Sequence, residues 1–379
     1  QVVVDGRRLR DTGSPNLDRE RNRDATTGLS GQFGKDIGSE HHLSYGFEYY
    51  RDDVEAAKTR TNIVTGATGT RAPRFPDGSR MDGWAVYIGD DWRSGRFDIN
   101  YGARYSRFDI SIPALGTTPG VSLKPDDLTG NVGIAFELSD DMRLVANLGR
   151  GFRAPNIFDL GVFGPRPGNR FSTPNPDLAP EYVTSIDAGL KFGGEHFSGE
   201  LIAFRSSYRD KITSVLTGNV IDGALEVQNR NVARLDLRGI EAGARYRLAS
   251  PAMELYATAT YTRGDEDTAT GTMPADRIPP LFGKLGARWQ WRETVGFEAY
   301  GFYASRQDRL SDRDRVDPRI NPAGTSGWAT LNARVSWRAS DRLDLSLRAE
   351  NLADRHYREH GSGLDEPGRN FILTADYRF

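Results

Sequence analysis

An alternation of apolar and polar side chains, recurring in segments of about ten residues, constrains this chain most. In residues 328–338, for example, Leu331 and Trp337 fall on one side of an extended strand and Arg334 falls on the other. Residues 342–350 repeat the pattern. Successive side chains of a strand point to opposite faces, so each segment predicts a strand with one apolar and one charged face. A dry sandwich core would not accept that charge, whereas a water-filled lumen does.

The connections between these segments alternate in length. Short connectors fall near residues 38–40, 94–96, 139–141, 193–196, 250–252, 292–294 and 339–341. Long stretches rich in Gly, Pro and Asp fall at 59–80, 112–126, 153–180, 216–230, 264–279, 305–326 and 354–369. Transmembrane barrels have short periplasmic turns and longer outer loops. The pattern therefore predicts an all-β fold, an antiparallel transmembrane β-barrel of about 15–16 strands.

Composition agrees with a barrel and excludes several other classes of protein. Hydrophobic residues make up 37% of the 379 residues, and no stretch approaches the roughly 20 apolar residues that a spanning helix needs. The net charge is -2 with the basic residues spread along the chain, so we expect no nucleic-acid partner. We find no nucleophile elbow, zinc-binding helix or phosphate loop, and we predict no enzyme activity and no cofactor.

Two local features refine the prediction. The alternation slips by one residue around Gly239, which predicts a glycine bulge. The first clear strand lies around residues 26–36, with an outer loop before it and the end of an earlier strand at 2–9. The alternation gives about fifteen strands, and bacterial barrels are usually even-stranded, so we expect that the N-terminal part of the protein is absent from this chain.

Several strings resemble the TonB-dependent receptor family. Residues 151–156 (GFRAPN) and 175–181 (NPDLAPE) are similar to the FRAP and NPxL boxes that bracket one large outer loop of that family. The segments 349–357, 367–371 and 377–379 resemble its last hairpin with a closing Phe. The resemblance implies a plugged receptor barrel of about 22 strands. Residues 1–379 would then be its C-terminal barrel portion, with the plug domain and the first strands missing.

The same resemblance implies a location and partners. It places the protein in the outer membrane of a Gram-negative bacterium, surrounded by lipid, and we expect a monomer. TonB would supply the drive through the missing N-terminal region, for active uptake of an iron compound. A passive porin-like channel is the alternative function.

The resemblance also bears on the ligand. Residues 74–79 and the two boxes are most similar to the heme and hemoglobin receptor branch, which places a heme-binding His between the boxes. Here residues 156–174 contain no His, Tyr or Met, so the usual axial ligand for heme iron is missing at that place. Heme or hemoglobin, a ferric siderophore and a vitamin-like cargo therefore remain as alternative ligands.

Candidate ligand-binding residues come from three outer loops, and no metal site is assigned. The arginines of the loop 306–320 would grip an anionic siderophore, its carboxylates would hold calcium, or the loop would neutralise itself. The histidines of the last loop would ligate iron or contact a porphyrin, or they would be ordinary solvated loop residues. His41, His42 and His196 adjoin short turns and are expected on the periplasmic side. The candidates are Arg153, Asn156, Phe158, Phe163, Arg170, Phe171, Asn175, Arg313, Arg315, His356, Tyr357 and His360.

Overall fold

The computed structural model describes residues 2–9, 15–114, 119–166, 169–268 and 271–379, with the side chains of 15 onward except 232 and 233. Parts of the predicted outer loops 112–126, 153–180 and 264–279 lie outside these residues. No described helix is long and apolar enough to cross a membrane.

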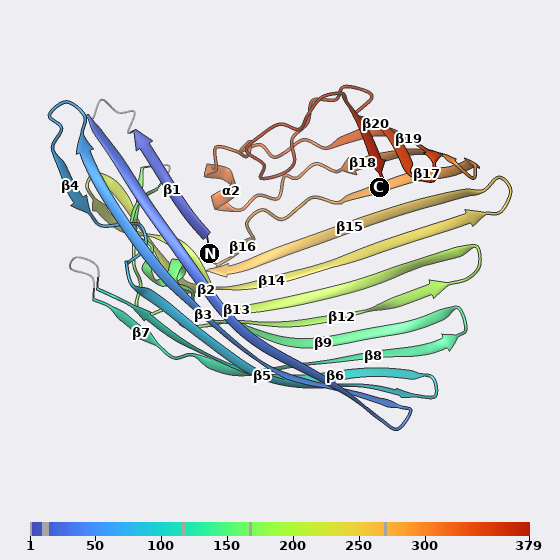
Figure 1. The fold of residues 1–379 in the computed structure, drawn as a ribbon, viewed down its shortest axis with the longest axis horizontal. Helices are drawn as coiled ribbons and strands as arrows, with labels where there is room; N and C mark the ends of the chain where they lie inside the picture. Colours follow the sequence, from blue (N-terminus) through green and yellow to red (C-terminus); the bar gives the residue numbers. More distant parts are fainter. Residues whose placement is uncertain (1, 10–14, 115–118, 167–168, 269–270) are drawn as a thin grey trace.

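The described strands, 21 in number, form a single sheet, and the fold is nearly all β as predicted (Figure 1). Five strands are short and belong to long connections, and the other sixteen follow one another in chain order as antiparallel neighbours. These long strands are β1 (Val2–Leu9), β2 (Asn16–Ile37), β3 (His41–Asn62), β5 (Ser79–Ser94), β6 (Phe97–Ile112), β8 (Asp126–Ser139), β9 (Met142–Arg153), β12 (Glu181–Gly193), β13 (Phe197–Ile221), β14 (Ala224–Leu248), β15 (Met253–Thr268), β17 (Phe282–Arg292), β18 (Val295–Ala304), β19 (Trp328–Ser340), β20 (Leu343–Glu350) and β21 (Asn370–Tyr377).

The remaining elements lie in the long connections. They are β4 (Thr68–Arg71), β7 (Val121–Leu123), β10 (Gly164–Arg166), β11 (Arg170–Thr173), β16 (Gly271–Pro274), α1 (Ile157–Gly161) and α2 (Asp312–Val316). The short turns gather at the right of Figure 1, at the opposite end of the sheet from β4 and β7. The predicted division into a short-turn end and a loop end is therefore confirmed.

The two faces of the sheet differ as the alternation predicts. On one face of β19, Leu331 and Trp337 are 54% and 50% exposed, and Leu347 of β20 is 48% exposed. On the other face, Thr330 and Asn332 are buried. Large apolar side chains thus cover the outward face, which suits lipid, while polar side chains line the inward face.

Two segments that the sequence predicted as outer loops, the one before residue 26 and residues 216–230, form strands instead. The first belongs to β2, which begins at Asn16 and whose outer part pairs with β3. Asp18 accepts a 2.6 Å hydrogen bond there from Nε of Arg60. The alternation fails in this part because charged side chains occupy both faces. The predicted loop 216–230 is instead the tip of the β13–β14 hairpin, closed by Asp222 and Gly223, whose φ angles are +49° and +77°.

The predicted bulge at Gly239 is absent. Gly239 pairs with Phe204 of β13 and Thr262 of β15, and the register is continuous on both sides. A Cβ at this position would lie 2.6 Å from the Phe204 ring, so glycine provides space for that ring. The apolar residues change face along this strand without a bulge. Leu235 is an apolar residue buried on the inner face, whereas Ile240 lies on the outer face and is 49% exposed.

The outer connections share an apolar core of their own. It joins the outer ends of strands with α1 and the two boxes, and consists of Ile110, Ile112, Val121, Ala154, Ile157, Leu160 and Leu178. Pro76 and Pro155 are fully buried beside it. The loops at this end are consequently a packed structure that can hold side chains in fixed positions.

Candidate ligand-binding site

Arg153 joins the two boxes at the base of the large loop. Its Nε donates to Glu181 and its terminal nitrogen donates to Asp159, both at 2.6 Å. Asp159 also forms a capping box with Asn156, which begins α1. The sequence predicted Arg153 and Asn156 as ligand-binding residues, and in the structure both make contacts that build the loop.

Asn175 fixes the second box to the hairpin next to it. Its side-chain amide donates to the carbonyl of Asn229 at 2.7 Å, and its backbone N–H donates to the carbonyl of Leu160 at 3.0 Å. The Asn175 side chain also accepts a bond from the backbone of Asp177. This candidate, too, holds the loop in place.

The three candidate phenylalanines lie in two aromatic pairs. Phe158 is 43% exposed and packs against Phe75 at a centroid distance of 6.1 Å. Phe163 and Phe171 meet edge to face at 5.1 Å. The backbone N–H of Phe163 donates to the carbonyl of Arg74, so both pairs adjoin one short segment of chain. Apolar rings are therefore available for a ligand beside this segment.

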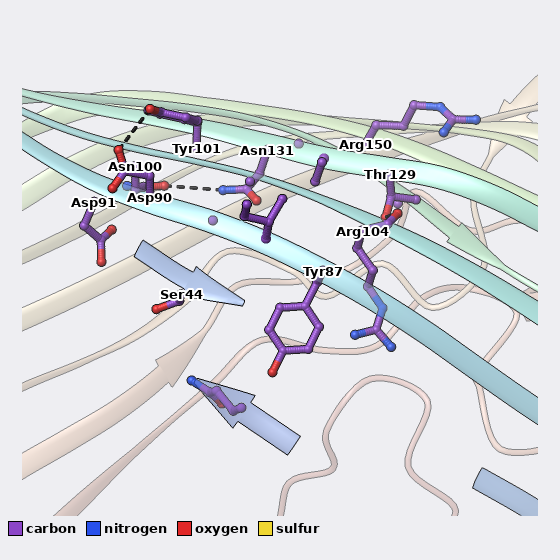
Figure 2. Close-up of a pocket in the computed structure, with 18 of the residues that line it drawn as sticks. Ser44, Tyr87, Asp90, Asp91, Asn100, Tyr101, Arg104, Thr129, Asn131 and Arg150 are labelled. Atoms are coloured by element: carbon purple, nitrogen blue, oxygen red, sulfur yellow. Dashed lines mark hydrogen bonds between the residues drawn. The ribbon is translucent and has the colours of Figure 1, made fainter. Parts of the chain in front are cut away.

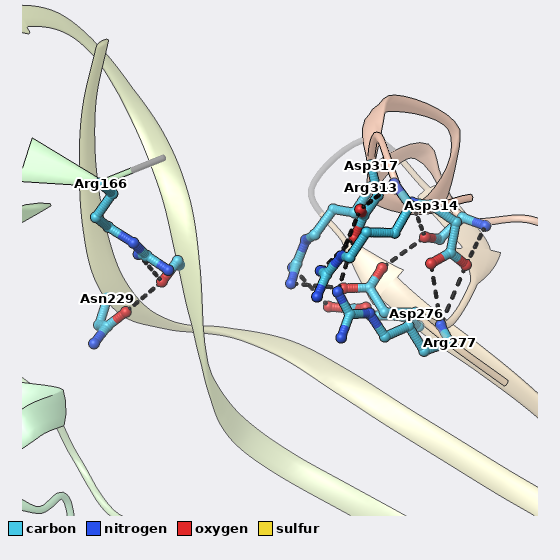
Figure 3. Close-up of polar contacts among 11 residues, drawn as sticks. Arg166, Asn229, Asp276, Arg277, Arg313, Asp314 and Asp317 are labelled. Carbon is cyan, nitrogen blue, oxygen red and sulfur yellow. Dashed lines mark hydrogen bonds and ion pairs between the residues drawn. The ribbon is translucent and has the colours of Figure 1, made fainter. Parts of the chain in front are cut away.

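Three arginines, which we call the arginine cluster, accompany these rings: Arg74, Arg166 and Arg170. The Arg74 guanidinium lies 6.0 Å from the Phe158 ring centre, and Arg166 donates to the Ser214 hydroxyl at 3.2 Å (Figure 3). Burial, followed by the charges of Arg74 and Arg170, lowers the pKa of Arg166. Within the described part of the chain, no carboxylate lies at ion-pair distance from these three side chains. The Glu20 carboxylate accepts a hydrogen bond from the backbone N–H of Arg74, but the three guanidinium groups themselves are available to an anion.

Sequence reasoning identified Arg170 but missed Arg74 and Arg166 as site residues. Arg74 belongs to a different outer connection, and Arg166 is brought beside Arg170 by the β10–β11 hairpin, in which the two residues are directly paired. Nothing in the spacing of these positions indicates that they meet.

Four arginines of the α2 loop have carboxylate partners: Arg306, Arg309, Arg313 and Arg319. Arg313 pairs with Asp276 at 2.9 Å and with the buried Glu266 at 3.6 Å, and Arg277 pairs with Asp317 at 2.8 Å (Figure 3). No group of three or more His, Asp or Glu among the described residues is arranged to hold a metal ion. These contacts support the self-neutralised loop over the anion and calcium alternatives. Arg315, in the last turn of α2, is exposed.

The last loop does not present two free histidines. Nε2 of His356 lies 3.1 Å from Asp365, and Nδ1 of His360 lies 2.9 Å from the Thr325 hydroxyl. Nε2 of His360 is buried without a hydrogen-bond partner in the described residues, and burial lowers the pKa of this ring. Tyr357 packs on Trp328 at 4.2 Å. His360 and Tyr357 therefore tie the last loop to its neighbour.

A polar hollow of about 830 Å³ lies against the wall, lined by residues of strands β2, β3, β5, β6, β8, β9 and β12 (Figure 2). Arg104 pairs with Glu48 at 2.6 Å in it, and Asn131 donates to Asn100 at 3.3 Å. Figure 2 shows Tyr87 and Arg104 on the opposite side of the strands from Tyr101. Such a surface offers polar groups to a hydrophilic compound or polypeptide in the lumen.

Comparison with known proteins agrees with this geometry. The family "TonB dependent receptor-like, beta-barrel" matches residues 4–352. The vitamin B12 transporter BtuB of Vibrio vulnificus is 27% identical over 257 residues, 66% of this chain and 37% of that protein. The heme/hemopexin utilization protein C of Haemophilus influenzae is 26% identical over 380 residues, 89% of this chain and 49% of that protein.

The fold also matches solved receptors. The unliganded ferric citrate transporter FecA has a TM-score of 0.75 and 16% identity, covering 99% of this chain and 57% of FecA. The chain thus spans less than half the length of either curated relative. With the family match over most of its length, the chain belongs to the TonB-dependent receptor-like β-barrels.

Proposed function

We propose that the protein containing this chain is a TonB-dependent receptor of the Gram-negative outer membrane that imports an iron compound. Residues 1–379 form the C-terminal part of its barrel, and TonB acts through an N-terminal region outside this chain. This function is supported by the family match, by relatives named as a vitamin B12 transporter and a heme/hemopexin utilization protein, and by the outward apolar face. The receptor acts as a monomer surrounded by lipid.

The arginine cluster favours an anionic ferric siderophore as the cargo. Guanidinium groups pair well with oxyanions, and these three have no carboxylate partner among the described residues. Phe158, next to Arg74, would pack on an aryl group of the ligand. The candidates Phe163, Phe171 and Arg170 belong to the same site.

Heme suits the described loops less well. Heme propionates would also be drawn to the arginines, but heme iron takes an axial ligand from the protein. The Nε2 atom of His360 is buried, and that of His356 is engaged with Asp365. An iron atom could therefore reach Nε2 of His360 only if the last loop opened, and Nε2 of His356 only if it left Asp365.

A titration of the full-length protein tests the ligand. We expect ferric tris-catecholate siderophore to quench tryptophan fluorescence saturably, and heme to give no saturable Soret shift. Arg166→Met should weaken siderophore binding about tenfold or more, which corresponds to roughly 1.4 kcal/mol. Arg315→Met, in the α2 loop, is the matched control and should bind normally. A saturable Soret shift without siderophore quenching would assign the site to heme.

Uptake by cells tests the transport mechanism separately. We expect iron accumulation through the receptor to stop when the tonB gene is deleted, because the family couples import to the TonB complex. Continued accumulation in the deletion strain would identify a passive channel instead.

A further inference from the structure

Asp90 places a carboxylate on the outward face of β5, where its neighbours are apolar or aromatic. Trp84, Val86 and Ile88 precede it on this face and are 42%, 49% and 53% exposed, and Trp92 follows it. Outward positions on a strand are two residues apart. A charge on a lipid-facing surface is destabilising unless other groups compensate it.

The neighbours of Asp90 satisfy one of its two oxygens. Oδ2 accepts a hydrogen bond from Nδ1 of His41 at 2.6 Å and another from the Tyr101 hydroxyl at 2.9 Å. The His41 ring stacks on Trp92, with an interplanar angle of 2°, and is held in place. The Asp90 side chain is only 10% exposed, yet its Oδ1 receives no hydrogen bond from any described residue. One buried oxygen therefore lacks a donor.

A cavity of about 440 Å³ adjoins this carboxylate on the outward face. Ile37, Leu43 and Ile88 supply apolar wall, while His41, Asp90 and Tyr101 supply polar groups. Ile37 and Ile88 are about half exposed, at 51% and 53%, so the apolar wall is accessible from the membrane side. An apolar groove with a polar patch suits an amphipathic molecule.

Lys35 adds a positive charge to the same face. It pairs with Leu43, which in turn pairs with Asp90, so Lys35 and Asp90 lie two strands apart, about 10 Å. Lys35 is exposed, and no carboxylate of the described chain lies at ion-pair distance from it. A cation and a carboxylate at this spacing complement the phosphate and the ammonium of a zwitterionic head group.

We propose that this outward pocket binds a phospholipid whose head group carries a primary ammonium. The ammonium donates to Asp90, the phosphate contacts Lys35, and an acyl chain lies along Ile37 and Leu43. A primary ammonium has the N–H donors that Oδ1 lacks, whereas a trimethylammonium has none. The short turns at 38–40 and 95–96 place the site at the short-turn end of the wall. This site is independent of the imported cargo.

Native mass spectrometry of the full-length protein tests the proposal. The protein is released from nanodiscs that contain equal amounts of phosphatidylethanolamine, phosphatidylcholine and phosphatidylglycerol with identical acyl chains. We expect phosphatidylethanolamine to be retained at least fivefold more than phosphatidylcholine. Asp90→Asn should abolish this preference. Asp91→Asn is the matched control: Asp91 pairs with His42 and its side chain points to the opposite face from Asp90, so the preference should stay intact.

A second variant protects the test against misfolding of Asp90→Asn. Lys35→Gln changes an exposed side chain and should reduce retention of all three lipids, since each carries a phosphate. Heat-dependent mobility on denaturing gels confirms that each variant is folded. Equal retention of phosphatidylethanolamine and phosphatidylcholine by the wild type overturns the proposal. A preference that survives in folded Asp90→Asn, or wild-type retention in Lys35→Gln, overturns it as well.

Discussion

The loops around α1 and α2 contain helices of the same length, each begun by a capping box, but different interactions hold them. The α1 loop rests on an apolar core that includes Leu160, which is fully buried. The α2 loop also buries Leu310 and Ile320, but it adds a charged anchor, with Arg313 contacting the buried Glu266. Both loops are rich in arginine. Among the described residues, four arginines of the α2 loop are paired with carboxylates, whereas the arginine cluster beside the α1 loop has no carboxylate at ion-pair distance.

The difference shows how a loop can be fixed and still bind. Around Leu160 apolar packing supplies part of the stability; Arg153 is paired with Asp159 and Glu181, but the arginine cluster is left without a carboxylate partner. Where ion pairs contribute the stability of a loop, as at Arg313, the guanidinium is already paired with carboxylates and is not available to a ligand. Arginine content alone therefore does not identify a binding loop, and the partner of each guanidinium has to be known.

The largest effect should come from the core of the α1 loop. Leu160→Ala should cost about 2–5 kcal/mol in the local stability of this loop, because it leaves a cavity among packed side chains. Hydrogen exchange of the α1 amides measures this opening. The control is Val316→Ala in α2, where the side chain is 68% exposed and the change should stay within about 0.5 kcal/mol. If the two variants had equal effects on hydrogen exchange, apolar packing would not be what holds the α1 loop.

Arg313→Ala should have the next largest effect, on the α2 loop. It leaves Glu266, whose side chain is 4% exposed, without this cationic partner, at a cost of about 1–3 kcal/mol. Faster hydrogen exchange at residues 311–317 would report it. Arg315→Ala, on the same helix, should change exchange little. If Arg313→Ala were as mild as Arg315→Ala, ion pairing would not be what holds this loop.

Arg166→Met should separate stability from binding. Removing a half-buried cation that lies near two others relieves repulsion, so the local stability should stay unchanged or rise by a few tenths of a kcal/mol. Siderophore affinity should fall at the same time. A variant that loses stability and affinity together would show that Arg166 holds the loop, as Arg313 does.

The sequence predicted the wall better than the site because the wall follows from local periodicity. Leu331 and Trp337 reveal their outward face through their neighbours two residues away. The boxes were also recognisable, but the roles of Arg153, Asn156 and Asn175 as loop-building residues depend on partners such as Glu181 and Asn229, which folding brings near. The arginine cluster needs the β10–β11 hairpin and the Phe163–Arg74 hydrogen bond to exist at all.

The smallest effect concerns pH and the contact between the last loop and the α2 loop. Burial lowers the pKa of His360 below its usual 6.5, so the unfolded or opened loop binds a proton more readily than the closed one. Above pH 6.5 the ring is neutral in both states and makes no pH-dependent contribution. As the pH falls from 6.5 through the lowered pKa, the closed loop should lose stability, by less than about 1 kcal/mol for a half-buried group. Hydrogen exchange of residues 357–362, corrected for the intrinsic rate at each pH, should show the loss. His360→Gln should abolish it, whereas His356→Gln should not, since His356 is 84% exposed. A loss that persists in His360→Gln would place the titrating group elsewhere in the contact.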